Sequence, residues 1–420
     1  MPRIQHDHHG LARRARLLVF FLAAVPAPLA AQREAPGALI AAARAVSGEV
    51  AAIRELPWLG AVDFRVSDRA TIQRYARAAL DREMSPEEWG AYETLLRHCG
   101  LIPARLDLRD LAVRLYTEQV AGYYDPQAKT FYLADWLPRL LQRAVVAHEA
   151  THALQDQHFD LARWLEAVPP SEDVALARAA VVEGDAMTAM LAYLVVPAGG
   201  SLADLPDIGR LLEGGSAKAA QGFPTFERAP AALQRLLLFP YVEGSAFVLA
   251  AFREGGWEAV DLLYREPPQS TEQILHPERY WGARDAPRGP ATPEGTGRAP
   301  LLIEGSWGEL GTQLVLAGAL GDSAAAVAAR GWDGDRYALY GSPSNPPAYA
   351  WTLLWDSPRA AARFAAAYAQ ATAARFPGST RVVTGRGRFR FENPARTLEL
   401  TWAGDTVEIR ENFAPSDRLD

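Results

Sequence analysis

Apolar residues recur with a helical period along the first quarter of the chain. From about residue 38 to residue 101 the sequence is rich in alanine, and the tetrapeptide SPEE at residues 85–88 is a typical helix start, because proline is tolerated in a first turn. We therefore predict a helical N-terminal region over residues 32–106, packed around the middle of the protein.

The period of the pattern changes in the next segment. The stretch LYTEQVAGYYDPQAKTFYLA, residues 115–134, alternates and is rich in aromatic and β-branched residues around Asp125-Pro126, which predicts two strands joined by a turn. A helical pattern then runs from about Pro138 to His158, and a further helix begins near Ser171.

Two later segments predict a loop and a buried helix. From Gly199 to Pro224 glycine and proline occur at intervals, which is typical of a surface loop. The apolar run from Leu236 to Phe252 contains Pro240 and Glu243, which disfavour a membrane span, so a buried and kinked helix is expected.

The composition changes once more before the C-terminal part. Residues 283–300 are too rich in proline and glycine for a core element and predict a linker. Beyond it, strand-like runs surround one alanine-rich helical stretch, so we expect residues 301–420 to form a small α+β module over an antiparallel sheet. The predicted fold class is α+β, with a mostly helical central domain over residues 107–282 that carries a small sheet.

The first 31 residues have the pattern of a secretory signal peptide. Arg13, Arg14 and Arg16 precede the apolar run LLVFFLAAVPAPLA, and small residues follow before Gln32. The apolar run is short and broken by proline, which disfavours a membrane anchor. We expect a mature chain that is exported to the periplasm or the extracellular space and has no integral membrane span.

Charge and cysteine content exclude several classes of partner and of stabilisation. The net charge is -7 and the isoelectric point is about 5.7, so no basic surface for nucleic acid or anionic lipid is expected. Cys99 is the single cysteine, which makes an intramolecular disulfide impossible. Packing must therefore stabilise an exported chain, and a metal ion can add to that stability.

The segment AVVAHEATHAL contains a motif with metal-binding spacing. His148 and His152 are four residues apart, so a helix projects both imidazoles from one face, as two nitrogen ligands of one zinc ion require. Glu149 points about 100° away, out of reach of the metal but within reach of a water bound to it. Zinc lowers the pKa of such a water to about 7, and Glu149 is the expected general base.

Two residues compete for the third ligand position. His158 follows His152 with the spacing of the metzincin motif, but Gln155 stands where that motif has the glycine that turns the chain back. In a continuous helix His158 would lie some 80° off the face of His148 and about 15 Å along the axis. Glu183 lies on the next predicted helix, an arrangement that resembles thermolysin and the gluzincins, and Gly184 beside it allows the helices to approach closely.

Two alternatives to Glu183 as the third ligand stay open. The segment around Glu243 repeats four of the five residues around Glu183, which makes Glu243 a rival ligand. Glu183 itself has a plain structural alternative, an ion pair with an arginine such as Arg178.

The segments EQVAGYYDP, HEATHALQDQHFDL, VVEGDA, YVEGSAFV, GGWEAVDLLY and STEQILHPERY resemble an uncharacterised family of exported bacterial zincin-like metallopeptidases. The resemblance covers roughly residues 115–280. It implies a zincin fold and one catalytic zinc ion held by His148, His152 and Glu183, with Glu149 catalytic. The chain departs from thermolysin-type gluzincins in having Met187 where those enzymes have an aspartate that orients a histidine; Asp185 is a substitute, although it points to another face.

The resemblance also implies roles for residues around this motif. TFYLA would be the edge strand along which an extended substrate binds, with a core strand as the alternative. His276, or else Tyr280, would donate a hydrogen bond to the oxyanion, with a His276 that caps the turn at Pro277 as the alternative. His98 is expected to be structural.

The sequence therefore predicts an exported zinc metallopeptidase that hydrolyses peptide bonds in a peptide or protein substrate. Two other functions remain open. One is a non-catalytic, zinc-containing envelope binding protein, which would have no use for a base at Glu149. The other is a zinc hydrolase of non-peptide amides.

Overall fold

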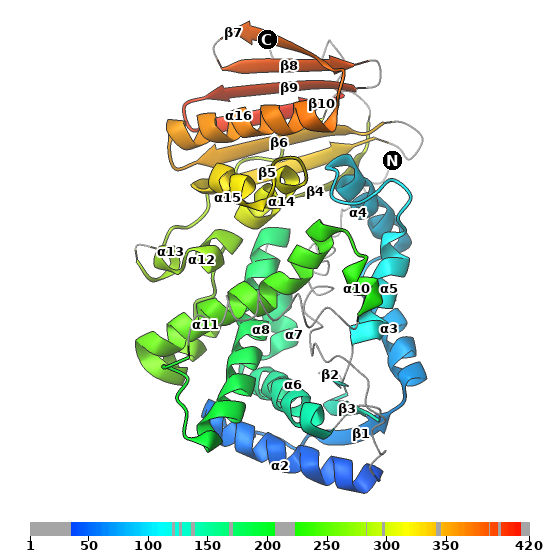
Figure 1. The fold of residues 1–420 in the computed structure, drawn as a ribbon, viewed down its shortest axis with the longest axis vertical. Helices are drawn as coiled ribbons and strands as arrows, with labels where there is room; N and C mark the ends of the chain where they lie inside the picture. The colour runs from blue at the N-terminus through cyan, green and yellow to red at the C-terminus, as the bar shows by residue number, and fades with distance from the viewer. Residues whose placement is uncertain are drawn as a thin grey trace, which may run out of the picture. The chain divides into compact units, whose positions relative to one another are not determined.

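The computed structural model describes most of the chain, and the fold is α+β (Figure 1). The described residues are 35–119, 122–125, 128–135, 139–167, 171–205, 223–282, 284–295, 299–341, 346–385, 387–393 and 396–412. The predicted signal peptide, and residues 206–222 of the predicted loop, lie outside these ranges.

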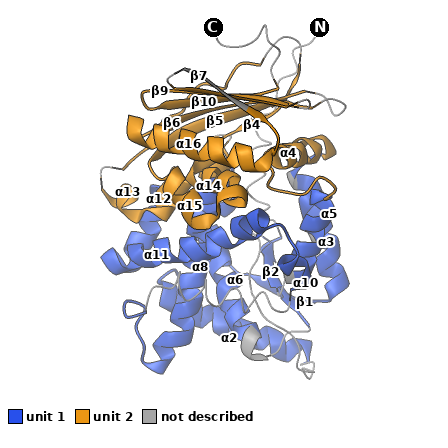
Figure 2. Ribbon diagram, turned by 45° about the horizontal axis from the view of Figure 1, so that its top comes forward, with its two compact units in different colours: residues 1–85, 107–169, 175–268 blue, residues 86–106, 170–174, 269–420 orange. Residues whose placement is uncertain are grey.

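Two compact units make up the chain, shown in blue and orange in Figure 2. The first unit contains residues 1–85, 107–169 and 175–268, and the second contains residues 86–106, 170–174 and 269–420. Each unit is therefore assembled from segments that are separate in the sequence, whereas the sequence pattern predicts consecutive regions.

Helices and a three-stranded sheet form the first unit. Its helices are α2 (Pro36–Arg54), α3 (Arg69–Glu83), α5 (Leu108–Gln119), α6 (Arg139–Phe159), α7 (Leu161–Glu166), most of α8 (Glu172–Val195), the short 3-10 helix η1 (Val196–Ala198), α10 (Pro224–Glu227) and α11 (Ala231–Arg265). Its strands are β1 (Asp63–Ser67), β2 (Gly122–Asp125) and β3 (Thr130–Ala134).

The three strands lie in the order β1-β3-β2, with β1 parallel and β2 antiparallel to β3. The TFYLA segment is β3, so the edge position expected for it is wrong: it is the central strand, and β2 is an edge strand. The reason is β1, whose alternating sequence DFRVS lies inside the region predicted to be helical and pairs with β3 across a long sequence separation.

The segment at residues 115–134 begins with a helix and not with a strand. Leu115 to Gln119 are the last turns of α5, in which Leu108, Leu111 and Leu115 are buried at a helical spacing. The aromatic residues that suggested a strand begin only at Gly122. Downstream, α6 and α8 begin close to their predicted starts, and α4 (Pro86–His98) begins at the predicted proline.

Apolar side chains on one side of the small sheet form the core that supports α6. Phe131 and Leu133 of β3 and Tyr124 of β2 belong to one buried cluster with Val146 and Leu154 of α6. The other side of the sheet packs through Tyr123 and Ala134 against buried residues of α3 and α5. The sheet is therefore covered on both sides, and α6 is held firmly against one of them.

The predicted apolar helix at residues 236–252 is part of α11. Pro240 lies inside this helix, and the residues with non-helical backbone angles are Gly255 and Gly256. By length and composition alone, α2, α11 and the segment Glu172–Ala198 are apolar enough to cross a membrane. The expectation that the mature chain has no membrane span stays a prediction.

The second unit contains a seven-stranded antiparallel sheet in the order β4-β5-β6-β10-β9-β8-β7. The strands are β4 (Leu301–Gly305), β5 (Trp332–Tyr340), β6 (Ala348–Trp355), β7 (Thr380–Gly385), β8 (Arg388–Asn393), β9 (Arg396–Ala403) and β10 (Thr406–Glu411). The helices are α4, α12 (Thr271–Leu275), α13 (Pro277–Trp281), α14 (Gly308–Leu320), α15 (Asp322–Ala329) and α16 (Pro358–Arg375).

Residues 284–295, within the segment predicted as a linker, contain no helix or strand but lie against the sheet of the second unit. Arg288 donates hydrogen bonds to Asp405 and to the carbonyl oxygen of Trp355, both at 3.0 Å, and the hydroxyl of Tyr340 donates to the carbonyl oxygen of Pro293 at 2.6 Å. These contacts make this stretch part of the second unit.

Candidate metal centre

Two histidines project from one face of α6. The rings of His148 and His152 have centroids 4.7 Å apart and are nearly perpendicular, at 89°. Both side chains are largely withdrawn from solvent, with exposed fractions of 8% and 14%. Ala147, just before His148, and Ala150, between the two histidines, are buried, so the apolar face of the helix fixes the direction in which the two rings point.

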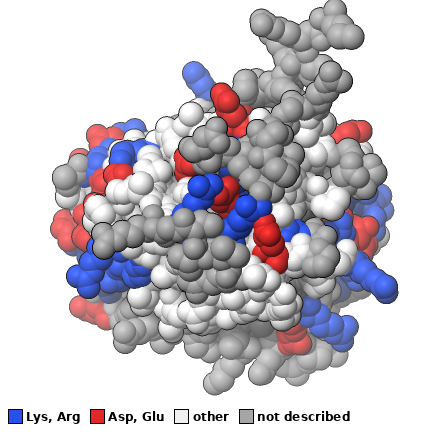
Figure 3. All heavy atoms as spheres, turned by 90° about the horizontal axis from the view of Figure 1, so that it is seen from above, with Lys and Arg blue, Asp and Glu red and all other residues white. Residues whose placement is uncertain are grey.

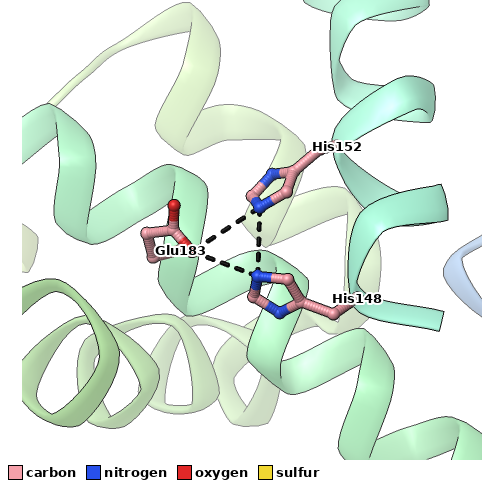
Figure 4. Close-up of side chains that lie close together, drawn as sticks. All are labelled: His148, His152 and Glu183. Atoms are coloured by element: carbon pink, nitrogen blue, oxygen red, sulfur yellow. Dashed lines mark hydrogen bonds and ion pairs between the residues drawn. The ribbon is translucent and has the colours of Figure 1, made fainter. Parts of the chain in front are cut away.

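Glu183 of α8 meets these two rings (Figure 4). Its Oε2 atom is 3.2 Å from Nε2 of His148 and 3.5 Å from Nε2 of His152, and the two Nε2 atoms are 3.1 Å apart. Among the described residues this is the one group of three or more histidine, cysteine or acidic residues close enough to share a metal ion.

The spacing of these three atoms fits a tetrahedral zinc ion. With zinc–ligand distances of about 2.0–2.1 Å, neighbouring ligand atoms in a tetrahedron are about 3.3 Å apart. The observed separations of 3.1, 3.2 and 3.5 Å bracket that value. Two imidazoles and one carboxylate are also a ligand set that zinc uses in catalytic sites, where one position is left open.

The burial of Glu183 also favours a cation. The side chain is 1% exposed, and in the part of the chain that the structure describes its oxygens have no hydrogen-bond partner besides the two imidazoles. A buried carboxylate with so few partners costs several kcal/mol of desolvation unless positive charge is close. The site is therefore built to hold positive charge between the two rings and Glu183.

The close approach of Glu183 to the two imidazoles also shifts the pKa values of these residues. Burial alone raises the pKa of Glu183, but the two imidazoles outweigh it and lower that pKa. Burial likewise lowers the pKa of His152, yet the charge of Glu183 beside it raises the value to about 9. Without a metal ion a proton occupies this group at neutral pH, so a metal must compete with that proton.

Glu149 lies beside the group and contacts the edge strand. Its Oε2 atom accepts a hydrogen bond of 3.1 Å from the backbone N–H of Tyr124 in β2. Burial raises the pKa of Glu149, and Glu183 adds to this, while the two imidazoles and the Tyr124 N–H oppose it; the net effect is a raised pKa. A carboxylate with a raised pKa close to a metal group is suited to accept a proton.

Tyr124 is held at both ends by α6. Its hydroxyl donates to Asp156 Oδ2 at 2.9 Å, and Lys129 Nζ lies 2.6 Å from the same oxygen. Glu149 and Asp156 are seven residues apart, so they lie on the same side of α6. The edge strand is therefore fixed in register with the helix that carries the two histidines.

The other candidate ligands lie elsewhere. Helix α6 continues unbroken to Phe159, and Nε2 of His158 is 2.7 Å from the carbonyl oxygen of Pro57. Glu243 forms an ion pair with Arg235. Arg178 donates a hydrogen bond to the carbonyl oxygen of Trp164 and lies over its ring, so the pairing of Arg178 with Glu183 is not found.

His276 and His98 belong to the second unit. Nε2 of His276 is 3.1 Å from Oε1 and 3.0 Å from Oε2 of Glu309, and its side chain makes no cap hydrogen bond at the start of α13. The oxyanion role of His276 stays a prediction. His98 is buried, with Nε2 3.0 Å from Glu411 Oε2.

The sequence analysis offered Asp185 as a substitute for the aspartate that orients a histidine, but it missed Gln155 and Arg54 on either side of Asp185. Nδ1 of His152 is 2.9 Å from Oε1 of Gln155, the residue that replaces the metzincin glycine. The Nε2 atom of Gln155 donates to Asp185 Oδ2, and Asp185 in turn accepts from Arg54. The spacing of His152 and Gln155, three residues apart on a helix, was a usable signal; nothing local pointed to Arg54.

Gly184 does allow a close helix approach, but its partner is α11 and not α6. A Cβ atom on Gly184 would lie 2.3 Å from the carbonyl oxygen of Gly244, and one on Gly244 would lie 2.3 Å from that of Ala180. The repeated Val-Glu-Gly sequence therefore marks the crossing of α8 and α11. That crossing sets the position of Glu183 on α8.

Comparison with known proteins covers only the C-terminal part of the chain. A family described as a domain of unknown function, DUF8575, matches residues 302–420. Searches of curated proteins and of solved structures find no match. The matched region lies within the second unit, so His148, Glu149, His152 and Glu183 all lie outside it.

Proposed function

We propose that this chain is a zinc-dependent metallopeptidase of the gluzincin type, with a zincin-like core in the first unit. The observation that carries the proposal is the group of three ligand atoms, two from one helix and one from another, separated by 3.1–3.5 Å. His148, His152 and Glu183 would hold the zinc ion. A fourth histidine, cysteine or acidic ligand is not present in this group among the described residues, as an open catalytic site requires.

Glu149 would act as the general base and later as the general acid. When bound, zinc supplies a Lewis acid and lowers the pKa of a water molecule to about 7. The carboxylate of Glu149 takes a proton from the attacking water and delivers it to the nitrogen of the leaving amine. Its pKa is raised by burial, and a carboxylate with a raised pKa holds a transferred proton more readily than an ordinary one does.

An extended peptide is the substrate that the local structure favours. The backbone N–H of Tyr124 points to Glu149, and hence away from β3, so the outer edge of β2 faces the catalytic base. An extended peptide can add to such an edge through main-chain hydrogen bonds. We propose that the substrate binds along β2, which brings its scissile carbonyl to Glu149.

The proposed setting is outside the cytoplasm. The predicted signal peptide over residues 1–31 supports export to the periplasm or the extracellular space. On the face shown in Figure 3, acidic and basic side chains of the described residues are intermingled and no broad basic area stands out.

The test combines metal analysis with a cleavage assay on the purified mature protein. We expect about one zinc ion per chain and cleavage of an unfolded protein substrate that a chelator abolishes and added zinc restores. Glu149→Gln should keep the zinc and lose about 10²- to 10⁴-fold in rate. Glu258→Gln, on an exposed position of α11, is the matched control and should behave as wild type.

Four results would count against the proposal. Wild-type protein that contains no zinc would contradict the metal centre. Undiminished cleavage by Glu149→Gln would contradict the role of Glu149 as the base. Wild-type protein that holds zinc but cleaves neither proteins nor peptides would favour the non-catalytic binding protein. Cleavage of small amides alone would favour the non-peptide hydrolase.

A further inference from the structure

We propose that Gln155 is the positioning residue of the metal centre and that the buried Arg54–Asp185 pair fixes its orientation. Gln155 would hold His152 in the tautomer that carries its proton on Nδ1, which leaves Nε2 free to bind the metal ion. This inference rests on the proposed zinc function and assigns roles to residues outside the motif, one of them on the N-terminal helix α2.

The first step is the orientation of the Gln155 side-chain amide. Its Nε2 atom lies 3.0 Å from the carbonyl oxygen of Val182 and 3.0 Å from Asp185 Oδ2. Both of these groups are acceptors only, and the amide nitrogen has two N–H donors, one for each. A flipped amide would place its oxygen against two acceptors in a site with no solvent exposure, so only one orientation is compatible with the surroundings.

The second step is the tautomer of His152. With the amide fixed, Oε1 of Gln155 faces Nδ1 of His152 at 2.9 Å. An amide oxygen can only accept, so Nδ1 of His152 must carry the proton. In a neutral ring the lone pair is then on Nε2, the atom that faces His148 and Glu183.

The third step is the anchor behind Asp185. Arg54 Nε donates to Asp185 Oδ1 at 2.7 Å, and the hydroxyl of Tyr264 donates to Asp185 Oδ2 at 2.9 Å. Arg54 also donates to Asp261 Oδ1 at 2.6 Å. Because Asp185 is held from this side, its Oδ2 atom presents an acceptor to Gln155 in a fixed direction.

Arg54 is itself firmly placed. Its side chain has no exposed surface, and its guanidinium lies 4.6 Å from the centroid of the Trp257 ring. The resulting chain of contacts runs from α2 through Asp185 on α8 to Gln155 and His152 on α6. The charge pair joins α2 to α8, which carries Glu183, and the hydrogen bond from Gln155 to Asp185 joins α8 to α6, which carries the two histidines.

The test compares Gln155→Met with Gln157→Met. Both residues lie on α6, and Gln157 makes hydrogen bonds only to the backbone of Leu59 and Gly60 in the described residues, so it is a matched control. Zinc affinity is measured by competition with a chromophoric chelator. We expect Gln155→Met to bind zinc about 10- to 100-fold more weakly and Gln157→Met to bind it as wild type does.

A spectroscopic readout separates positioning from a general loss of structure. In ¹⁵N-histidine-labelled, zinc-loaded wild type we expect a His152 signal from a protonated Nδ1 that exchanges slowly with water. In Gln155→Met this proton should exchange fast or the signal should disappear, while His148 keeps its signal. Circular dichroism identifies the folded variants, and Gln155→Leu replaces Gln155→Met if the latter does not fold.

The outcomes distinguish this inference from the function on which it rests. Wild type that binds no zinc overturns both. Wild type that binds zinc and cleaves peptides, together with a folded Gln155→Met or Gln155→Leu that keeps the affinity and the protected Nδ1 proton, overturns the role of Gln155 alone. Equal loss of zinc in Gln157→Met would also overturn it, because the effect would then belong to the end of α6.

Discussion

Replacing Gly184 by alanine should destabilise the first unit, although alanine is the better helix former. The new Cβ atom would lie 2.3 Å from the carbonyl oxygen and 2.4 Å from the carbonyl carbon of Gly244, and 2.9 Å from a methyl group of Val248. Two of these atoms are backbone and cannot rotate away. Ordinary contact begins at 3.4 Å, so α8 and α11 must separate by about 1 Å.

The size of the effect follows from two opposing terms. Overpacking a buried site costs typically about 1–3 kcal/mol, and we expect the upper end because the clash is with backbone. The change from glycine to alanine in a helix returns up to about 1 kcal/mol. The net loss is about 2 kcal/mol, which corresponds to a decrease of roughly 4–8 °C in Tm for a unit of this size.

The assay is thermal unfolding of the apo protein, followed by circular dichroism, with Gly48→Ala as the matched control. Gly48 lies in the interior of α2, is exposed, and would have nothing within 4 Å of a new Cβ atom. Gly48→Ala should therefore keep or slightly raise the Tm.

A double variant tests the mechanism. Gly244→Ala brings its own Cβ to 2.3 Å from the carbonyl oxygen of Ala180 across the same crossing. Once the helices are apart, the second methyl group meets less resistance, so the combined loss should be smaller than the sum of the two single losses. A Tm for Gly184→Ala at or above that of wild type would refute the close crossing, and additive losses would refute the shared separation.

Three further predictions follow from individual contacts. Glu183→Ala should lose bound zinc, measured by metal analysis, while Glu243→Ala keeps it; the reverse would transfer the ligand role to Glu243. Arg54→Met should lower stability by about 3–5 kcal/mol in urea unfolding, because it leaves Asp185 charged and buried without its partner; a loss below 1 kcal/mol would contradict this. Burial raises the pKa of Glu411, but His98 and Arg396 outweigh it and lower it to about 2. Since the folded pKa is lower than the model value of 4.5, this group stabilises the fold above pH 4.5 by on the order of 3 kcal/mol, and the contribution is lost between about pH 4.5 and 2. Glu411→Gln should flatten that part of the Tm–pH curve, and an unchanged slope would contradict the pairing.

Local periodicity was enough to predict the helix that carries the candidate site. The apolar positions around His148 and His152 repeat with the period of a helix, and the absence of a glycine at position 155 indicated that α6 continues past it. Two side chains four residues apart on a helix must share a face whatever the rest of the chain does. The relation of Glu149 to the two histidines follows from the same geometry.

Short segments with mixed signals were predicted less well. The strand β1 was missed because its five residues are surrounded by helical patterns, and Leu115 to Gln119 were assigned to a strand although they end α5. At β1 the pairing partner decides the structure, whereas the end of α5 is decided by the burial of Leu108, Leu111 and Leu115 along one helix face. The strand β1 is stabilised by β3, 67 residues further along at every pair of the register, and the sequence around β1 contains no trace of that partner.

What the sequence determined by itself is the face of α6 that presents two imidazoles and a base, because an i, i+4 relation is fixed by the helix alone. Only the tertiary structure decided which residues complete and support that face. Glu183 and Asp185 contact residues of α6, and Arg54 contacts Asp185, because the helices pack together; Arg54 lies 131 residues from Asp185 in the sequence. Contacts between distant segments depend on the packing of the whole unit, and no local pattern of apolar and polar residues encodes them.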